Sequence, residues 1–486
     1  MRDFRLEFRP FSFVALHEGK ICRKPNEHTT AYVKGMIGQD NVQAYLGLIS
    51  ENRHLPFSII AITGDGKEIV IFEGVTTCPM ISQVGGVATM TIEAKSGSYL
   101  MDRKKRFRTF LDANVLHSQI LNLLGEPYAD YNFILKTSIG DAIGRPSSFQ
   151  SIGTKSEMIQ DAPLGRFTVQ YMETDWAFAK RLASRQNTFL VPADTHPGIR
   201  YYFGMPNTDG HILDDDIDFD MIRDYENHDE KIRQGLRDTS EADAICYVVR
   251  HREIFMVGDI VQYRGMRLFI DQITTELTGQ ELMHVYHLRP RSGLRVPTYY
   301  NENIIGASLD GHVIAIRNDR VQVQIRGDEN VGQTIQQWFS YATPYSSPDG
   351  TGWYCMPERG DQIRLYMPDR EEANAVVFNA LHVTSSARRN PDVKSMRNRH
   401  GKEVRFTPNA IVMTDNAGSE VSIVDGEGVR VESSGDILMK ADGNVDITSG
   451  ANVSMLAGDS VVVQQGGTSL VVDDNIAFVG GRLDMQ

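Results

Sequence analysis

Features that would mark a disulfide-stabilised, secreted or membrane-spanning protein are scarce in this sequence. The four cysteines lie far apart and form no CxxC pair: Cys22, Cys78, Cys246 and Cys355. This spacing excludes a disulfide framework and a zinc ribbon, and it suits a reducing cytoplasm. No stretch approaches the roughly 20 apolar residues that span a bilayer. The start of the chain lacks the apolar region of a signal peptide, so we expect cytoplasmic synthesis and assembly.

Basic residues are also fewer than acidic residues. The 486 residues include 50 Lys and Arg against 63 Asp and Glu, a formal net charge of −13. This balance disfavours electrostatic binding to nucleic acid or to anionic lipid. The hydrophobic share of 41% is typical of a globular protein, and the length predicts about three domains.

The C-terminal segment lacks proline, histidine and almost all aromatic residues. No proline follows Pro408, no histidine follows His400, and Phe478 is the only aromatic residue beyond position 410. Residues 411–486 hold twelve acidic and three basic side chains, which places most of the net charge in this segment. Without histidine the segment lacks one common metal ligand, and the missing aromatics argue against sugar stacking.

This segment does contain a repeat of eight residues. Glycines and short polar residues separate the octads, and two apolar positions recur in each, two places apart. The recurring residues are Val421, Ile423, Val429, Val431, Ile437, Met439, Val445, Ile447, Val453, Met455, Val461 and Val463. Because residues i and i+2 share one face of a strand, each octad predicts a short strand with one apolar face.

These twelve residues, called the stripe below, need a covering partner. Burying them cannot by itself offset the conformational entropy lost when their own segment becomes ordered. An intertwined β-helix of three chains would bury every stripe along a shared axis and pair every strand edge. The alternative is a single-chain β-solenoid with three octads per turn, and about 76 residues would give it only some three turns without a cap.

The rest of the chain reads as a small barrel preceded by a mixed region. Between Ser308 and His382, the alternation of Arg320–Arg326 predicts a half-buried strand after a hairpin turn at Asn318–Asp319. Strands are expected at 58–62, 69–72, 259–263 and 266–270, and an amphipathic helix at 103–124 with the basic run 103–106 at its wet start. A second helix is expected to begin at Thr174–Asp175 and to bury Trp176, Ala179, Leu182 and Ala183.

Several motifs together resemble one family. Gln170, Tyr171, Glu173, Thr174, Asp175 and Trp176, followed by Ala179–Ala183, resemble the QYxETDWxFxxRL signature of VgrG proteins and related phage tail hubs. Further similar stretches are Gly258–Val261, Tyr286–Pro290, Gly311–Val313, Arg320–Val323, Gly352–Tyr354, Pro357–Asp361, Val376–Asn379 and Ser395–Phe406. The match runs in the family's order along nearly the whole chain.

The resemblance implies a mainly β, homotrimeric hub-spike of a contractile injection system. Its expected parts are a tandem-barrel tail-hub domain with inserted helices (1–300), an OB-fold collar (301–383), a neck (384–410) and a triple-stranded β-helix needle (411–486). The implied partners are two further copies, a hexameric inner-tube protein, baseplate wedge proteins and a PAAR-type tip protein. The needle would penetrate a membrane transiently and leave the cell or particle on firing.

Other functions fit the residues less well. Nucleic-acid binding by the OB-fold is disfavoured by its charge, six arginines and no lysine against ten acidic residues, and Trp338, Trp353 and Tyr354 are interpreted as packing residues. A spike-associated hydrolase is also disfavoured, because the gap between barrel and needle is too short for an enzyme domain and the sequence has no HExxH, GxSxG or Walker motif.

Metal sites are not indicated either. The acidic run at 214–220 fails the EF-hand pattern, and His284 and His287 are expected on opposite strand faces. We therefore expect no catalytic residue, no metal and no cofactor; a glycan-binding β-helical tailspike remains a rival.

Overall fold

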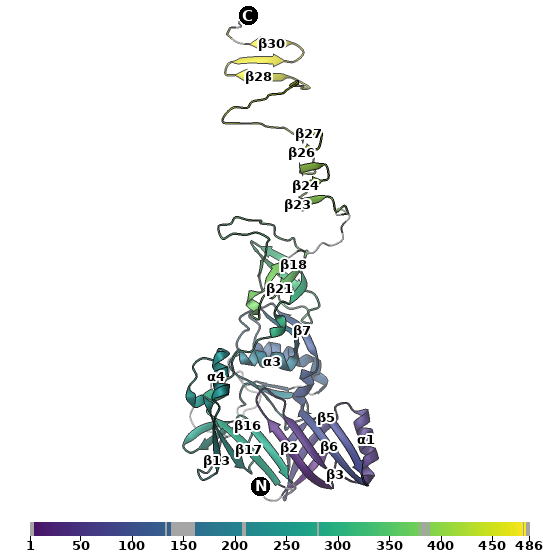
Figure 1. Ribbon diagram of the computed structural model, residues 1–486, viewed down its shortest axis with the longest axis vertical. Coiled ribbons are helices and arrows are strands. Elements are labelled where there is room, and N and C mark those ends of the chain that lie inside the picture. Colours follow the sequence, from purple (N-terminus) through teal and green to yellow (C-terminus); the bar gives the residue numbers. More distant parts are fainter. Residues whose placement is uncertain are drawn as a thin grey trace. The chain divides into compact units, whose positions relative to one another are not determined.

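The computed structural model describes residues 4–131, 134–137, 161–206, 210–278, 281–378, 380, 385, 389–479 and 481–482. The chain forms two compact units, Met1–Val383 and Thr384–Gln486 (Figure 1). Strands dominate both units, which confirms the prediction of a mainly β protein. Asn379, the predicted boundary at 383–384 and the C-terminal Gln486 lie outside the described residues.

The largest element of the first unit is a sheet of twelve strands. Its N-terminal half comprises β1 (Phe4–Arg9), β2 (Ala15–Arg23), β3 (Thr30–Ile37), β4 (Pro56–Thr63), β5 (Glu68–Val84) and β6 (Val87–Ser96). Its second half comprises β12 (Gly210–Ile212), β13 (Phe219–Arg223), β14 (Ile245–His251), β15 (Ile260–Tyr263), β16 (Met266–Thr278) and β17 (Glu281–Arg289). The halves join where β2 pairs antiparallel with β16, so the order is β1-β4-β5-β6-β3-β2-β16-β17-β14-β13, with β15 on β16 and β12 on β15.

Each half of this sheet has its own hydrophobic core. Ile21, Val33 and Phe72 belong to the first core, and Val261 and Tyr286 belong to the second. The resemblance implies two tandem barrels in this region. Among the described strands, however, the pairings join the two halves into one sheet and close neither half on itself. Within β17, His284 is buried and His287 lies on the other face, as the strand period requires.

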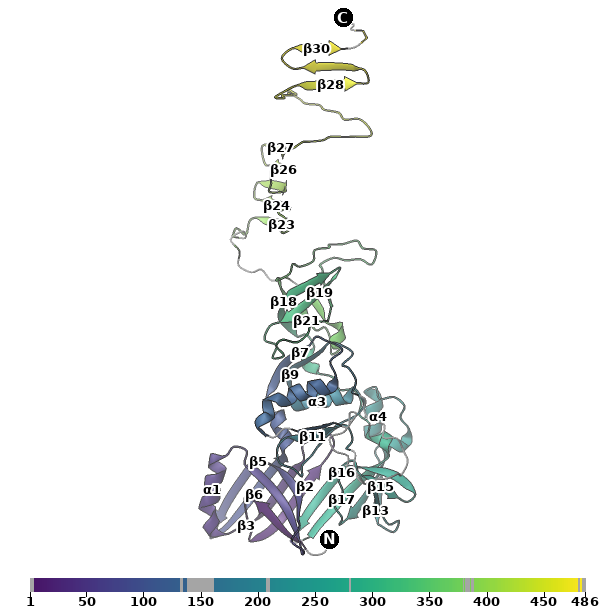
Figure 2. The same cartoon turned by 180° about the vertical axis from the view of Figure 1, so that it is seen from behind.

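In the sequence, the first half of the sheet is followed by a layer of helices and short strands (Figure 2). It includes β7 (Lys105–Phe110), α2 (His117–Gly125), β8 (Ile134–Thr137), β9 (Thr168–Thr174), α3 (Asp175–Ser184), β10 (Leu190–Pro192) and β11 (Arg200–Phe203). Outside this layer lie α1 (Val42–Glu51) and α4 (Tyr225–Arg233). Short 3-10 helices are η1 (Gln39–Asn41), η2 (Gly97–Asp102), η3 (Glu126–Tyr131), η4 (Glu241–Ala244), η5 (Arg291–Leu294), η6 (Glu302–Ile304) and η7 (Glu372–Asn374).

The prediction of one helix over 103–124 is wrong. Its first part is the strand β7, which contains half of the basic run, and only its last part is the helix α2. The strand forms because β9, some sixty residues later, supplies the hydrogen bonds of an antiparallel ladder. A turn follows, in which Asn114 N donates to Asp112 Oδ1 over 2.9 Å. A local window that shows only apolar spacing does not reveal so distant a strand partner.

The barrel is closed, as expected of an OB-fold. It consists of β18 (Ser308–Arg317), β19 (Arg320–Ile325), β20 (Phe339–Tyr341), β21 (Gln362–Tyr366) and β22 (Val376–Phe378). The predicted hairpin is present, because Arg317 pairs with Arg320 and Asn318 adopts a positive φ of 54°. Alternate residues of β19 are buried in the barrel, which explains the alternation seen in the sequence.

The interpretation of the barrel aromatics as packing residues is wrong for two of them. Trp353 is 56% exposed and Tyr354 is 75% exposed, whereas Trp338 is half-buried. Both exposed rings lie on the loop before β21, where Gly352 forms an isolated bridge with Ser346. The loop is therefore held by backbone contacts and leaves its rings outside the barrel core.

The second unit is a series of antiparallel strands. They are β23 (Lys394–Arg397), β24 (Glu403–Thr407), β25 (Ala410–Thr414), β26 (Ser419–Val424), β27 (Gly428–Ser433), β28 (Val461–Gln465), β29 (Thr468–Val472) and β30 (Ile476–Val479). Strands β23 to β27 form one sheet and β28 to β30 another. Residues 434–460, all of which are described, form no strand within the chain.

Candidate functional site: a buried ion network between the N-terminal region and the barrel

The signature motif lies on β9 and the start of α3, beside β7. The ladder between β7 and β9 contains a bulge, because Arg106 pairs with Glu173 whereas Phe107 pairs with Tyr171. The extra residue, Met172, has a positive φ of 50° and points to solvent. A bulge shifts the alternation of a strand by one residue, which is how Gln170 and Glu173 both become buried.

Asp175 is the centre of the first buried cluster. Its side chain is fully buried and accepts hydrogen bonds from Arg108 Nη1 over 2.5 Å, from Gln170 Nε2 over 2.9 Å and from Tyr128 Oη over 2.8 Å. Burial and the charge of Asp175 raise the pKa of the Tyr128 hydroxyl, so the phenol stays a donor. The carboxylate is thus compensated on both oxygens, which a buried charge requires.

The same motif starts helix α3. Thr174 is the N-cap, and its hydroxyl oxygen accepts a hydrogen bond from Ala177 N over 3.1 Å. Trp176, in the first turn, is buried and packs edge-on against Tyr201 with ring centroids 5.5 Å apart. The predicted helix start is confirmed, and Ala179, like the other residues of its predicted stripe, is buried.

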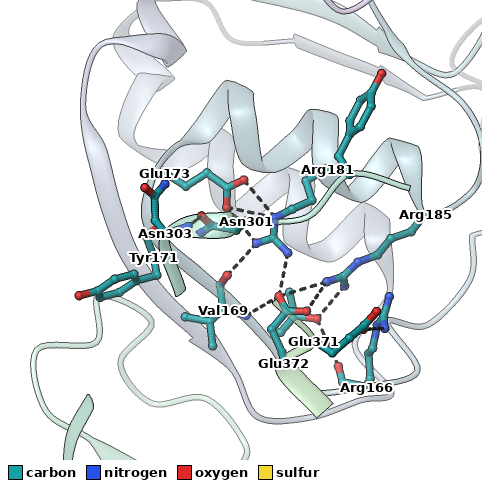
Figure 3. A network of polar contacts seen from close by, with 12 residues as sticks. Arg166, Val169, Tyr171, Glu173, Arg181, Arg185, Asn301, Asn303, Glu371 and Glu372 are labelled. Carbon is teal, nitrogen blue, oxygen red and sulfur yellow. Dashed lines mark hydrogen bonds and ion pairs between the residues drawn. The ribbon is translucent and has the colours of Figure 1, made fainter. Parts of the chain in front are cut away.

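Arg181, one and a half turns further along α3, links the signature to the barrel (Figure 3). Its guanidinium donates to Glu173 at 2.9–3.3 Å, to Val169 O at 2.7 Å and to Glu372 Oε1 at 2.7 Å. Glu372 belongs to η7, between the barrel strands β21 and β22. Burial alone would lower the pKa of Arg181, but the charges of Glu173 and Glu372 outweigh it and raise that pKa.

A second arginine shares the same glutamate. Arg185 Nη2 lies 2.9 Å from Glu372 Oε2, and both side chains are buried. Burial and repulsion from Arg181 lower the pKa of Arg185 to about 10, still well above neutral pH. Burial would raise the pKa of Glu372, but the two arginines lower it on balance. Two buried glutamates therefore face two buried arginines, and at the half-buried margin Arg166 pairs with Glu371 over 2.9 Å.

The free edge of β7 is bound by a barrel loop. Thr109 N donates to Asp328 Oδ1 over 3.0 Å, and Leu111 N donates to Gln333 Oε1 over 2.8 Å. Arg106 Nη1 lies 3.0 Å from Glu329 Oε2. Leu111 is also part of the barrel core. The loop of residues 328–337 and η7 thus hold the β7–β9–α3 layer from two sides, and the interpretation of the basic run as a wet helix start is wrong for Arg106.

A serine, a histidine and an aspartate also meet in this layer, but without access for a substrate. His28 Nδ1 lies 2.9 Å from Ser98 Oγ, and His28 Nε2 lies 3.4 Å from Asp102 Oδ2. Burial lowers the pKa of His28, which suits a general base. Ser98, however, is fully buried, and a nucleophile must reach its substrate. The arrangement stabilises η2 and supports no hydrolytic step.

The side chains of the network hold one another in position. All its carboxylates are matched by guanidinium groups or hydrogen-bond donors, and in the described residues no three His, Cys, Asp or Glu side chains are grouped to hold a metal. The structure brings Gln170, Glu173 and Asp175 into the network. Thr174 caps α3, Trp176 packs against Tyr201, and the ring of Tyr171 points away (Figure 3). Sequence reasoning missed Arg108 and Glu372, because neither residue stands in a family-like stretch and the acidic pair of Glu371 and Glu372 gives no local sign of its partner.

The stripe belongs to the second unit. In β26 and β27, Val421 pairs with Val431 and Ile423 with Val429. Val461 and Val463 lie in β28. The stripe residues between Ile437 and Met455 are 53 to 68% exposed in the single chain. None of these pairings is the parallel coil of a solenoid, and what covers the stripe is taken up below.

Comparison with solved structures identifies the fold. No protein-family model and no curated protein sequence matches the chain. The chain is similar to the Escherichia coli c3393 protein, described as a component of the type VI secretion system with structural similarity to the T4 bacteriophage tail proteins gp27 and gp5, with a TM-score of 0.50, 12% identity and coverage of 77% of this chain and 99% of that one. It is also similar to the lidded Francisella PdpA–VgrG complex, with a TM-score of 0.51, 11% identity and coverage of 86% and 76%.

A lidless PdpA–VgrG complex gives the same TM-score, 0.51, at 10% identity over 86% of this chain. At these identities the similarity establishes the fold. The protein therefore has the fold of the VgrG and phage tail hub-spike proteins, and the recognition made from the sequence motifs is confirmed at that level. None of the described helices is long and apolar enough to cross a membrane.

Proposed function

We propose that three copies of this chain form the hub and spike of a contractile injection system, of the type VI secretion or phage tail kind. The observation that carries the proposal is the exposed stripe. Residues such as Val445 and Ile447 recur at one spacing, face solvent in the single chain and have no strand partner within it. Two further copies would cover these side chains and supply the missing ladders.

The fold similarity supports separate roles for the parts of the chain. The twelve-stranded sheet and its helical layer serve as the hub, which meets a hexameric inner tube and the baseplate wedge proteins. The octad segment, residues 411–486, serves as the needle and carries a tip protein of the PAAR type. Because strands of three chains bond to one another, bending the needle would break several ladders at once. The acidic surface keeps this exposed β-structure soluble.

The buried ion network has a mechanical part in this function. Axial force on the needle must pass through the barrel to the hub, and the ion pairs of Arg181 and Arg185 with Glu372 join α3 to the barrel. A buried network of ion pairs is costly to open, because each separated charge would lose its partner away from water. The network therefore holds the barrel and the β7–β9–α3 layer together as one rigid unit.

Solution mass tests the proposal. The full chain is expected to run in light scattering at about three times the 54.5 kDa of one chain. A stable monomer at micromolar concentration would contradict the trimer. Binding of the C-terminal segment to a glycan array would instead favour the tailspike function.

A further inference from the structure

The two halves of the twelve-stranded sheet repeat one strand order. The first half runs β1-β4-β5-β6-β3-β2 and the second runs β12-β15-β16-β17-β14-β13, so in both the first strand along the chain is followed by the fourth, fifth, sixth, third and second. Within the chain, β2 of the first half pairs with β16 of the second. The repeat therefore defines a second junction of the same kind, between β13, the counterpart of β2, and β5, the counterpart of β16.

Bulges at matching places set the register of this second junction. Strand β16 has a bulge at Asp271; β15 pairs only with the part before it, and β2 pairs with Ile273–Leu277, which begins two residues after it. Strand β5 has its bulge at Thr77, and β4 likewise pairs only with the part before it. The segment of β5 that corresponds to Ile273–Leu277 is therefore Pro79–Gln83.

Both strand edges of the second junction are open in the single chain. Among the strands that the structure describes, β13 pairs only with β14, and beyond its bulge β5 pairs only with β6. All of β13 is exposed, with Met221 at 52% and Ile222 at 45%, and on β5 Met80 is 54% exposed. An unpaired edge with apolar side chains is a template for another strand. The two edges lie on opposite sides of the sheet (Figure 1, Figure 2), so β13 can meet this segment only in another copy.

The residues of β2 and β13 correspond through their ladders. Across β3 and β6, Ile21 of β2 is in line with the residue directly before the β5 bulge. Across β14 and β17, Met221 of β13 is in line with the residue directly before the β16 bulge. Ile21 pairs with Thr275 within the chain, so its counterpart Met221 would pair with Ile81, the counterpart of Thr275.

We infer that β13 pairs antiparallel with Pro79–Gln83 of a neighbouring copy of this chain, and that three such head-to-tail contacts close the hub into a ring. This inference rests on the proposed trimer. The register places Ile222 opposite Met80, so two half-exposed apolar side chains cover each other, and it places Asp220 opposite Ser82, whose hydroxyl can donate to the carboxylate. A ladder this short buries too little surface to hold three chains by itself, so it orients the hubs while the stripe holds the trimer.

Disulfide trapping in the full chain tests the pairing. Residues directly opposite on antiparallel strands have Cα atoms about 4.5–5.5 Å apart, within the range that a disulfide spans. The exposed native cysteines, Cys78 and Cys355, are first replaced by serine. Met80→Cys combined with Ile222→Cys, oxidised by air with copper phenanthroline, should then give covalent dimers and trimers on non-reducing gels.

A second pair checks the register and a control checks the place. Ser82→Cys combined with Asp220→Cys should cross-link to a similar extent, because these residues are also directly opposite. Met80→Cys combined with Ile212→Cys is the matched control, since Ile212 on β12 is 84% exposed but lies outside the junction, and it should give no covalent species. The unfolding temperature of each reduced variant verifies that it is folded.

Light scattering of the same samples before oxidation separates this inference from the trimer itself. A trimer in which Met80→Cys and Ile222→Cys cross-link no faster than the control pair would overturn the junction, although the trimer would remain. A monomer would contradict the trimer and the junction together.

Discussion

Arg181 Nη1 donates to Glu372 Oε1 over 2.7 Å although the two residues are 191 positions apart in the sequence. The first belongs to the signature helix α3, and the second to η7 in the barrel. This buried contact joins the signature helix to a barrel residue that stands in none of the family-like stretches. It couples the β7–β9–α3 layer to the barrel, so its loss should destabilise both.

Arg181→Met should destabilise the first unit by about 3–5 kcal/mol, because Glu173 and Glu372 would keep buried charges with fewer partners. Chemical denaturation followed by circular dichroism measures the change. Arg233→Met is the control, since Arg233 pairs with Glu230 at an exposed site, and it should leave the midpoint unchanged. Equal effects of the two substitutions would show that the buried network adds no stability.

Thr174→Ala should cost about 0.5–2 kcal/mol, because it removes the side-chain acceptor for Ala177 N at the start of α3. Thr174→Ser keeps the hydroxyl oxygen and should recover most of the loss. The free energy of unfolding from urea titration measures both. A serine variant as unstable as the alanine variant would assign the effect to the lost methyl group.

His284 should make the stability depend on pH. Burial, followed by the charge of Arg23, lowers the pKa of His284 to about 4, below its value of about 6.5 in an unfolded chain. Between these values the unfolded state binds more protons, so stability is full above about pH 6.5 and falls by about 3 kcal/mol as pH drops to about 4.

His284→Gln removes this contribution and should flatten the stability profile between pH 6.5 and 4 relative to the parent chain. His17→Gln, at an exposed position, is the matched control and should leave the profile as it is. Denaturation midpoints measured at half-unit pH steps give both profiles. If the parent and the His284 variant lose stability in parallel, the buried imidazole is not the group that titrates.

Val445→Asp combined with Ile447→Asp should abolish the trimer, because two charges per chain would enter the shared apolar axis. Asn444→Asp combined with Thr448→Asp adds the same charge on the opposite strand face and should leave the trimer intact. Light scattering of both double variants measures the mass. A trimer that survives the first pair would refute the inward placement of the stripe.

Features that depend on a few neighbouring residues could be predicted from the sequence. The alternation of Arg320–Ile325, the turn at Asn318 and the N-cap at Thr174 each reflect the local period of a strand, turn or helix. The resemblance could be recognised because matched stretches, such as Gln170–Trp176 and Pro357–Asp361, occur in the family's order.

Only the tertiary structure decided which distant segments meet. It made Lys105–Phe110 a strand by placing β9 beside it, it matched Glu372 to two arginines of α3, and it left Trp353 outside the barrel core. It also brought Asp194 to Arg23, 171 positions away in the sequence. Such pairings depend on chain closure over tens to hundreds of residues, and a short stretch of sequence carries no record of its partner.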